Sequence, residues 1–239
     1  MRTVPEGATT RSPEVLRAIA NRGAAELVGA SAEEVITWSV AEFGDSIVAT
    51  QSMANTGLST LIASVAPCIP VVFIDTGYHF TETLDTLERV RVRTGLTILS
   101  VSSHLTIEEQ SAQHGPDLWN RDPALCCSIR KVQPLEEVLA GRDAWLTGMR
   151  RDAVLTRRDT QPIAYDHKRN VVKVSPLLDW SDDELDAYTV EHSVEISPLI
   201  SQGFPSIGCR PCTRQVPPGE DPRSGRWSGF DKTECGLHQ

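Results

Sequence analysis

Short apolar runs alternate with longer amphipathic stretches along most of the chain. The short runs are rich in Val, Ile and Leu, which is typical of buried strands, and they predict strands at residues 47–49, 71–74, 96–101 and 145–147. The amphipathic stretches predict helices at residues 13–27, 32–43, 58–65, 82–94 and 182–192, with others beginning near 107 and 123. This alternation predicts an α/β fold with a mostly parallel sheet and helices on both faces.

Local signals mark several of the helix starts. Ser31, Thr106 and Ser181 each precede a Glu by three residues, which is the pattern of a capping box. Periodicity also predicts which side chains face the core in the first and fourth helices. These are Val15, Leu16, Ile19 and Leu27 in the first, and Leu84, Leu87 and Val90 in the fourth.

Polar loops follow three of the predicted strands, at residues 50–57, 75–80 and 148–152. Ligands bind outside the carboxyl ends of parallel strands, so we expect these loops to contribute to one site. The first loop leads into a helix, and a helix N-terminus favours an anion such as phosphate. Ser52 would serve there either as an anion ligand or simply as the N-cap of the helix. The sequence has no Walker P-loop.

Composition and charge exclude some classes of protein. The 239 residues are 40% hydrophobic and 23% charged, which is ordinary for a globular protein, and the formal net charge is −9. The negative charge argues against a general nucleic-acid-binding or membrane-surface protein. No apolar run approaches the ~20 residues of a membrane span, and residues 1–10 do not resemble a signal peptide. We therefore expect a cytoplasmic protein.

Six cysteines in a cytoplasmic protein indicate metal or redox chemistry, because structural disulfides are rare in that compartment. Cys126 and Cys127 are adjacent near a helix start, and Cys209 and Cys212 form a C-x-x-C motif. Neighbouring helical residues point about 100° apart. That geometry favours separate corners of an iron–sulfur cluster over the alternative, a single tetrahedral zinc ion. Cys68, just before a strand, is expected to be a core residue.

The remaining cysteine, Cys235, lies in the last stretch of the chain, where segments are usually exposed. We interpret it as a chemically active thiol. Basic residues cluster near the cysteine motifs and strand ends although the chain is acidic: Arg130 and Lys131, Arg150 and Arg151, Arg157 and Arg158, and Arg223 and Arg226. Such clusters favour binding of a small polyanion through charge-assisted hydrogen bonds.

Together these motifs resemble the phosphoadenylyl-sulfate (PAPS) and adenylyl-sulfate (APS) reductase family, and in particular its bacterial assimilatory iron–sulfur branch. The resemblance covers roughly residues 35–238, and its matching segments are residues 74–80, 122–135, 147–152, 180–182, 205–212, 225–227 and 234–238. The combination of a double Cys, a C-x-x-C and a terminal Glu-Cys-Gly-Leu-His is highly specific. Within the family, the cluster cysteines accompany use of APS, and the branch that lacks them generally uses PAPS.

The resemblance implies a fold like that of the adenine-nucleotide α-hydrolases. We expect a disordered segment at 1–11, a nucleotide-binding domain with the iron–sulfur site at 12–215, and a mobile tail at 216–239. Cys126, Cys127, Cys209 and Cys212 would hold one [4Fe–4S] cluster per chain. Cys235 would attack the sulfur of APS, releasing AMP and leaving an S-sulfocysteine, from which thioredoxin would release sulfite.

The resemblance also implies that the protein acts in sulfate assimilation and cysteine biosynthesis. It further implies roles for residues other than the cysteines. Lys131 would bridge cluster and substrate electrostatically, and His238 would orient or activate Cys235. The expected substrate-binding residues are Ser52, Asp75, Gly77, Gly148, Arg150, Arg158, Arg223 and Arg226. The first loop departs from the family pattern, because Gln51 and Asn55 stand where a serine and an acidic residue are usual.

Two alternatives remain open. One is a PAPS reductase that carries a cluster, which turnover of the two substrates would distinguish. The other is a non-catalytic iron–sulfur sensor, which would leave Cys235 without a role. The expected partners are APS and thioredoxin, with no nucleic acid and no membrane.

Overall fold

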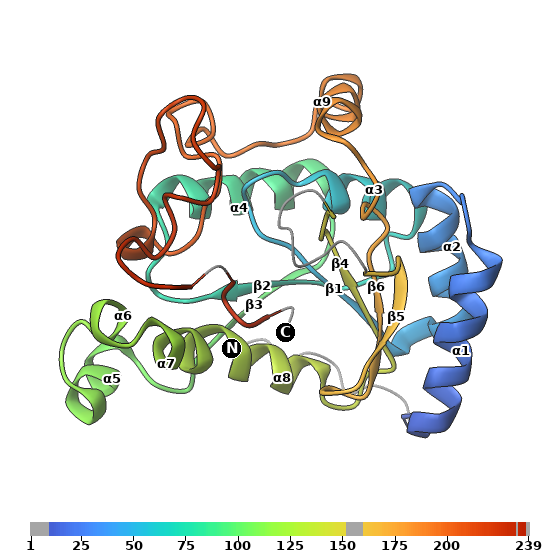
Figure 1. The fold of residues 1–239 in the computed structure, drawn as a ribbon. Helices are drawn as coiled ribbons and strands as arrows, with labels where there is room; N and C mark the ends of the chain where they lie inside the picture. Colours follow the sequence, from blue (N-terminus) through green and yellow to red (C-terminus); the bar gives the residue numbers. More distant parts are fainter. Residues whose placement is uncertain (1–9, 152–159, 233, 238–239) are drawn as a thin grey trace.

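The computed structural model describes residues 10–151, 160–232 and 234–237. A six-stranded sheet lies at its centre (Figure 1). Its strands are β1 (Ile47–Thr50), β2 (Val71–Asp75), β3 (Ile98–Ser102), β4 (Ala144–Thr147), β5 (Ile163–Asp166) and β6 (Val171–Val174). The strand order is β3-β2-β1-β4-β6-β5, and every pairing is parallel except that of β5 with β6. The prediction of a mostly parallel sheet is confirmed.

The helices occur close to their predicted positions. They are α1 (Pro13–Glu26), α2 (Ala32–Phe43), α3 (Gly57–Val65), α4 (Thr81–Thr94), α5 (Ile107–His114), α6 (Leu118–Arg121), α7 (Pro123–Cys127), α8 (Gln133–Leu139) and α9 (Asp182–Glu191). Short 3₁₀ turns lie at η1 (Gly44–Ser46) and η4 (Arg210–Cys212), and a π-helix, η2 (Ser128–Val132), joins α7 to α8. The capping boxes of Ser31, Thr106 and Ser181 are all formed.

Alternation along each strand divides the core into two layers, because successive side chains point to opposite faces. The strand residues that pack with α1 to α4 are Ile47, Ala49, Val71, Phe73, Ile98, Ala144, Leu146, Ile163, Val172 and Val174. Those on the opposite face, with α8, are Val48, Val72, Leu99, Trp145 and Val171. Helices therefore cover both faces of the sheet, as predicted and as Figure 1 shows.

Three details of the predicted core are wrong. Val15 and Leu84 are 46% and 40% exposed, because each lies at the edge of its helical apolar stripe, whereas Leu16 and Leu87 are buried. Cys68 is exposed. It lies in a turn closed by the Ile69 amide, which donates to the Ala66 carbonyl, and the turn holds Cys68 outside the core.

The hairpin formed by β5 and β6 was not predicted from the sequence. Its strands have four residues each and are joined by a turn without glycine, in which Asn170 takes the left-handed conformation at φ 55°. Hairpin turns are recognised in sequence mainly by Asn-Gly or Asp-Gly pairs, so this turn lacks the usual signal. The hairpin extends the sheet beyond β4 and becomes important at the site.

The segment after α9 returns to the sheet in a long path, orange to red in Figure 1. Three backbone hydrogen bonds fold it onto itself: Val216 to Gly203, Arg214 to Gly225, and Trp227 to Cys212. The final described residues then run between the sheet and α8 (Figure 1).

Near the N-terminal end of the chain, Arg11 is the last residue of the segment 1–11 that was expected to be disordered. Its amide donates to Asp143 and its guanidinium to the Glu42 carbonyl. Within the described residues, no helix is both long enough and apolar enough to cross a bilayer.

Candidate functional site

The centre of the sheet contains a topological switch point between β1 and β4. From β1 the chain proceeds outward to β2 and β3, and it then returns to β4 on the other side of β1. Thr50 and Thr147, the last residues of β1 and β4, are paired in register. Both line a cavity of about 370 Å³. Switch points are the usual ligand sites of open α/β sheets, so the topology places the cavity where a ligand is expected.

One part of the cavity is apolar. Its lining includes Met53, Leu58, Phe73, Leu177 and Leu185, which come from the first loop, α3, β2, the segment before α9, and α9. Apolar walls with a few polar groups suit a flat heteroaromatic ring.

The first loop is held in shape by its own side chains. The Gln51 amide donates to the carbonyl oxygens of Ser52 and Asn55, and the Asn55 side chain accepts from the Gly57 amide at 2.9 Å. Asn55 therefore satisfies a free N–H at the start of α3, and Ser52 is not the N-cap. Ser52 instead lines the cavity and is exposed.

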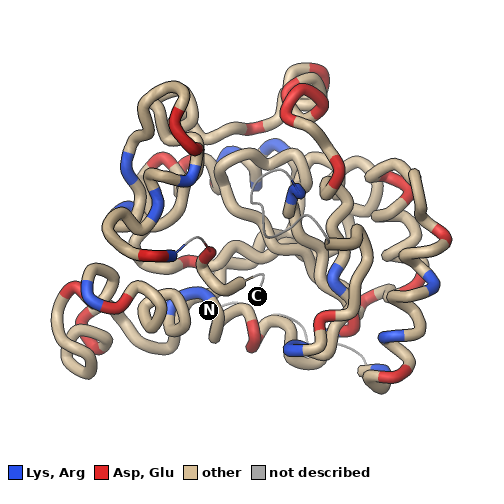
Figure 2. The backbone as a smooth tube through the Cα atoms, viewed as in Figure 1, with Lys and Arg blue, Asp and Glu red and all other residues tan. Residues whose placement is uncertain are grey.

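Basic side chains also line the cavity: Lys131 beside Cys235, Arg150 beside α9, and Arg223 and Arg226 from the segment after α9. Arg150 is paired with Asp182 at 2.5 Å, at the start of α9. Arg226 is buried, donates to the Ser206 hydroxyl at 3.2 Å, and stacks on Trp227 at 4.4 Å. Figure 2 shows basic positions along the segment that follows α9, whereas α9 itself is acidic. The protein is acidic overall, but these basic side chains suit the cavity to an anion.

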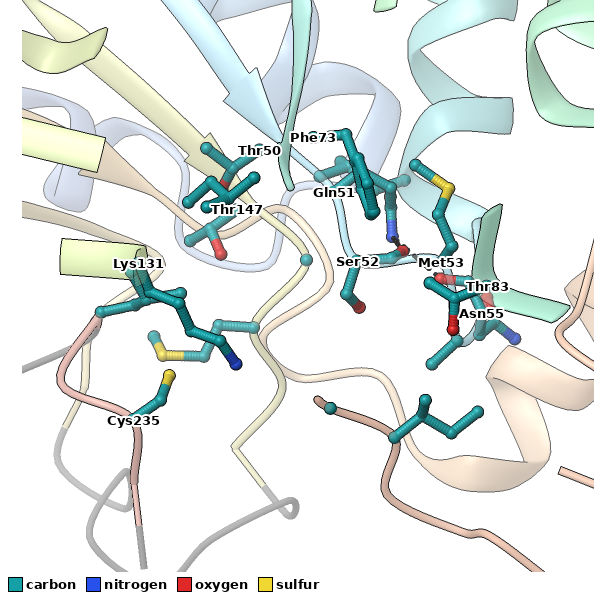
Figure 3. A pocket seen from close by; sticks show the side chains of 18 of the residues that line it. Thr50, Gln51, Ser52, Met53, Asn55, Phe73, Thr83, Lys131, Thr147 and Cys235 are labelled. Carbon is teal, nitrogen blue, oxygen red and sulfur yellow. Dashed lines mark hydrogen bonds between the residues drawn. The ribbon is translucent and has the colours of Figure 1, made fainter. Parts of the chain in front are cut away.

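Cys235 and Lys131 lie together on one side of the cavity, and Met53, Asn55 and Thr83 lie on the opposite side (Figure 3). Burial lowers the pKa of Lys131, because it disfavours the charged ammonium. The nearby sulfurs of Cys209 and Cys235 have the opposite effect and outweigh burial, so the pKa of Lys131 is raised. A charged lysine beside a cysteine stabilises the thiolate, which is the nucleophilic form.

The four remaining candidate cysteines border a second, narrow cavity. Cys126 and Cys127 reach it from α7, and Cys209 and Cys212 from η4. Lys131, Arg226 and Trp227 line both cavities and so separate the cysteine set from the first cavity. In the part of the chain that is described, no group of three or more His, Cys, Asp or Glu side chains is arranged to hold a metal ion.

The chemistry of the cysteine set fits an iron–sulfur cluster. Burial, with neighbouring cysteines adding to it, raises the pKa of Cys126 to about 11 and that of Cys212 to about 12. Burial also raises the pKa of Cys127. Buried thiols of this kind ionise at neutral pH only where a cationic centre offsets their charge. Soft thiolate ligands from two segments around one cavity are what an iron–sulfur centre requires.

Of the other predicted site residues, one lines the cavity, two lie apart from its lining, and two fall outside the described residues. Asp75 accepts from the Gly77 amide at 2.9 Å, and Gly77 has a φ of 73°, so this pair shapes the turn after β2. Gly148 lines the cavity. Arg158 and His238 fall outside the described residues.

Trp227 is a site residue that the sequence reasoning did not identify. It lines both cavities and is buried, and its φ of 45° is in the left-handed region, which costs a non-glycine residue about 1 kcal/mol. Its position directly after Arg226, inside a segment that matches the family pattern, was the available signal. Glu234 and Leu237, on either side of Cys235, also line the first cavity.

Comparison with known proteins gives the family. Residues 47–215 match the phosphoadenosine phosphosulfate reductase domain. The adenosine 5'-phosphosulfate reductase of Streptomyces coelicolor is 46% identical over 95% of this chain and 97% of its own length. That of Mycolicibacterium smegmatis is 43% identical over 96% of this chain and 98% of its own length. The chain belongs to the phosphoadenosine phosphosulfate reductase family.

Solved structures agree with this assignment. A phosphoadenylyl-sulfate reductase from Candida auris, solved as a phosphate complex, superposes with a TM-score of 0.72 at 26% identity over 88% of this chain and 100% of that chain. An FMN adenylyltransferase from Candida glabrata has a TM-score of 0.57 at 15% identity, over 90% of this chain and 70% of that chain, and shares the fold. The predicted family and fold are therefore confirmed. Like its relatives in the reductase family, the protein is an oxidoreductase that acts on a sulfur group.

Proposed function

We propose that this reductase converts APS to sulfite and AMP in sulfate assimilation, with Cys235 as nucleophile and thioredoxin as electron donor. One observation carries the proposal: the Cys235 thiol lies in a switch-point cavity beside Lys131 and two arginines. The curated relatives with 42–46% identity are named for the same substrate. Such a thioredoxin-dependent enzyme would work in the cytoplasm, where thiols are kept reduced.

Binding would use the two parts of the cavity for the two ends of the substrate. The adenine would lie against the apolar walls near Met53 and Leu58, and the phosphosulfate would reach toward Lys131, Arg223 and Arg226. Guanidinium groups bind such oxyanions with paired hydrogen bonds, and Lys131 adds a single charge at the reacting end.

The reaction would proceed through two thiol exchanges. The Cys235 thiolate attacks the sulfur of APS and forms an S–S bond, while the bond from sulfur to the bridging oxygen breaks and AMP leaves with its electron pair. A thioredoxin thiolate then attacks the Cys235 sulfur and expels sulfite, and its second thiol releases Cys235 and completes the thioredoxin disulfide. The dithiol supplies both electrons, and covalent catalysis divides a difficult reduction into two easier steps.

Cys126, Cys127, Cys209 and Cys212 would hold a [4Fe–4S] cluster in this proposal. When bound, the cluster supplies a fixed charge distribution beside Lys131 and exchanges no electrons. Lys131 lines both cavities, so it would face the thiolate set on one side and the sulfonate on the other.

Anaerobically purified protein should be brown and contain about four iron atoms per chain. Colourless protein with one zinc would contradict this assignment.

The proposed function is tested by intact mass. We expect wild-type protein incubated anaerobically with APS, without thioredoxin, to gain one SO₃ group, and added thioredoxin to remove it as sulfite. A gain with PAPS and none with APS would keep the mechanism and change the substrate. No gain with either compound would overturn the proposal and favour a binding or sensing role.

Gly208→Ala is expected to raise the KM for APS about tenfold by moving Arg226, because charge-assisted contacts depend on guanidinium geometry. A Cβ at Gly208 would lie 2.1 Å from Nη2 of Arg226, the far end of a flexible side chain, so the guanidinium would move and the fold would be kept. Steady-state kinetics and thermal melting would measure the two effects. Ser206→Ala is the milder comparison, since it removes one hydrogen bond each from Arg226 and Arg223 and leaves the space of both side chains open. A KM unchanged in Gly208→Ala would exclude Arg226 from substrate binding.

A further inference from the structure

The described end of the chain is anchored on both sides of Cys235. On the preceding side, Glu234 is buried and pairs with Arg223 at 3.8 Å. On the following side, the Gly236 carbonyl accepts from Nη2 of Arg169 at 3.3 Å. The thiol therefore lies between two contacts made by different parts of the molecule, and their positions determine where it points.

Arg169 is a rigid anchor. It lies in the turn between β5 and β6, and only 2% of its side chain is exposed. Its guanidinium pairs with Asp166 at 2.9 Å and lies over the Trp145 ring at 5.6 Å. Asp166 also accepts from the backbone amides of Lys168 and Arg169, so the turn and the guanidinium are held together.

Leu237 supplies an apolar contact next to the polar one. It packs against the core layer on the α8 face of the sheet, which includes Leu135 and Val138 of α8, Trp145 of β4 and Val171 of β6. The backbone turns at Gly236, where φ is 90°, a conformation that L side chains rarely adopt. At this turn Leu237 packs on the apolar layer at the edge of the cavity lining, and Cys235 lies in the cavity beside Lys131.

We propose that Arg169 and the apolar contact of Leu237 are positioning elements for Cys235, and that they hold its thiol in the cavity. This inference rests on the proposed role of Cys235 as nucleophile. It gives a catalytic purpose to the β5–β6 hairpin, in addition to its part in the sheet and the core. Neither Arg169 nor Leu237 needs to touch substrate, because each acts through the short backbone segment that carries the thiol.

The test measures the accessibility of Cys235 separately from turnover. Holoenzyme would be treated anaerobically with iodoacetamide, and alkylation at each cysteine would be followed by peptide mass spectrometry, because Cys68 is also exposed. We expect Leu237→Ala to alkylate about fivefold faster at Cys235, because losing part of an apolar contact raises the population of the open segment. Arg169→Lys keeps a cation near Asp166 and should show a smaller increase. Phe230→Ala, an exposed position earlier in the same segment, is the control and should match wild type.

The catalytic readout is the rate of SO₃ transfer to Cys235 from saturating APS. We expect Leu237→Ala to slow this step about fivefold, with the affinity for AMP and the melting temperature unchanged, since the loss is in positioning. Gly236→Ala strains the turn, so we expect it to slow SO₃ transfer to a similar extent as Leu237→Ala.

Alkylation and transfer rates equal to wild type in both Leu237→Ala and Gly236→Ala would overturn the inference, as would faster alkylation without slower transfer. If wild-type protein shows no SO₃ transfer at all, the proposed function fails, and the positioning role fails with it. Faster alkylation in Leu237→Ala would then show that the contact holds the segment without a catalytic purpose.

Discussion

Replacing Cys235 by serine should abolish the release of sulfite from APS, with kcat/KM reduced at least about 10⁴-fold, as is usual when a covalent nucleophile is removed. A serine hydroxyl is almost fully protonated at neutral pH and makes no leaving group that a thiol can exchange, so neither proposed step can occur. The assay would follow thioredoxin-dependent sulfite release and, in parallel, the intact mass of the protein after APS. The variant should gain no SO₃ group.

Two measurements make this result specific. The iron content of Cys235→Ser should equal that of wild type, because Cys235 lines the first cavity and the four cysteines proposed to hold the cluster line the second. Cys68→Ser is the matched control, since it removes an exposed thiol remote from both cavity linings and should keep full activity. Sulfite release by Cys235→Ser at more than a trace would show that another group accepts the sulfonate.

Replacing Lys131 by methionine is expected to lower kcat/KM for APS by about 10²- to 10³-fold, the usual effect of removing one charged group that stabilises a transition state. The lysine lies beside Cys235 and lines both cavities, so its charge would stabilise the Cys235 thiolate and the departing phosphate of AMP together. Methionine has a similar length and carries no charge. Single-turnover transfer of SO₃ to Cys235 would measure the effect without the thioredoxin step.

Lys131→Arg is the matched control. It keeps the positive charge but changes its shape, so we expect a loss smaller than that of Lys131→Met. The melting temperature of Lys131→Met should be at or below that of wild type, because the nearby sulfurs outweigh the cost of burying the Lys131 charge. Equal activity of Lys131→Met and wild type would remove Lys131 from the mechanism and leave Arg223 and Arg226 as the anion-binding groups.

Much of the fold could be predicted from the sequence because its signals are local. A capping box such as that of Ser181 is decided by residues three positions apart, and buried runs such as 71–74 are decided by composition. The β5–β6 hairpin was missed because its turn carries no glycine, and Val15 and Leu84 were misplaced because periodicity does not give the width of the buried stripe.

Some features of the candidate site could likewise be predicted from the sequence, and others could not. The reactive residues, above all the cysteines and the arginines near the tail, were identified from motifs whose residue types indicate a particular chemistry. Asp75 and Gly77 belong to the same motif as neighbouring residues, yet they shape a turn, because a motif does not say which of its members face the ligand. Trp227 was missed because only packing shows that its ring lies between the two cavities.

By itself, the sequence determined the family, the element types and the chemistry available, since these depend on residue identity and on short-range hydrogen bonding and hydrophobic pattern. Only the tertiary structure decided which residues meet. Cys127 and Cys209 share a cavity, and Arg169 reaches the Gly236 carbonyl, although each pair is far apart in the chain. The physical reason is that such contacts arise from the packing of whole elements around the sheet. In this protein, strand order brings β4, the hairpin and the tail together at Cys235.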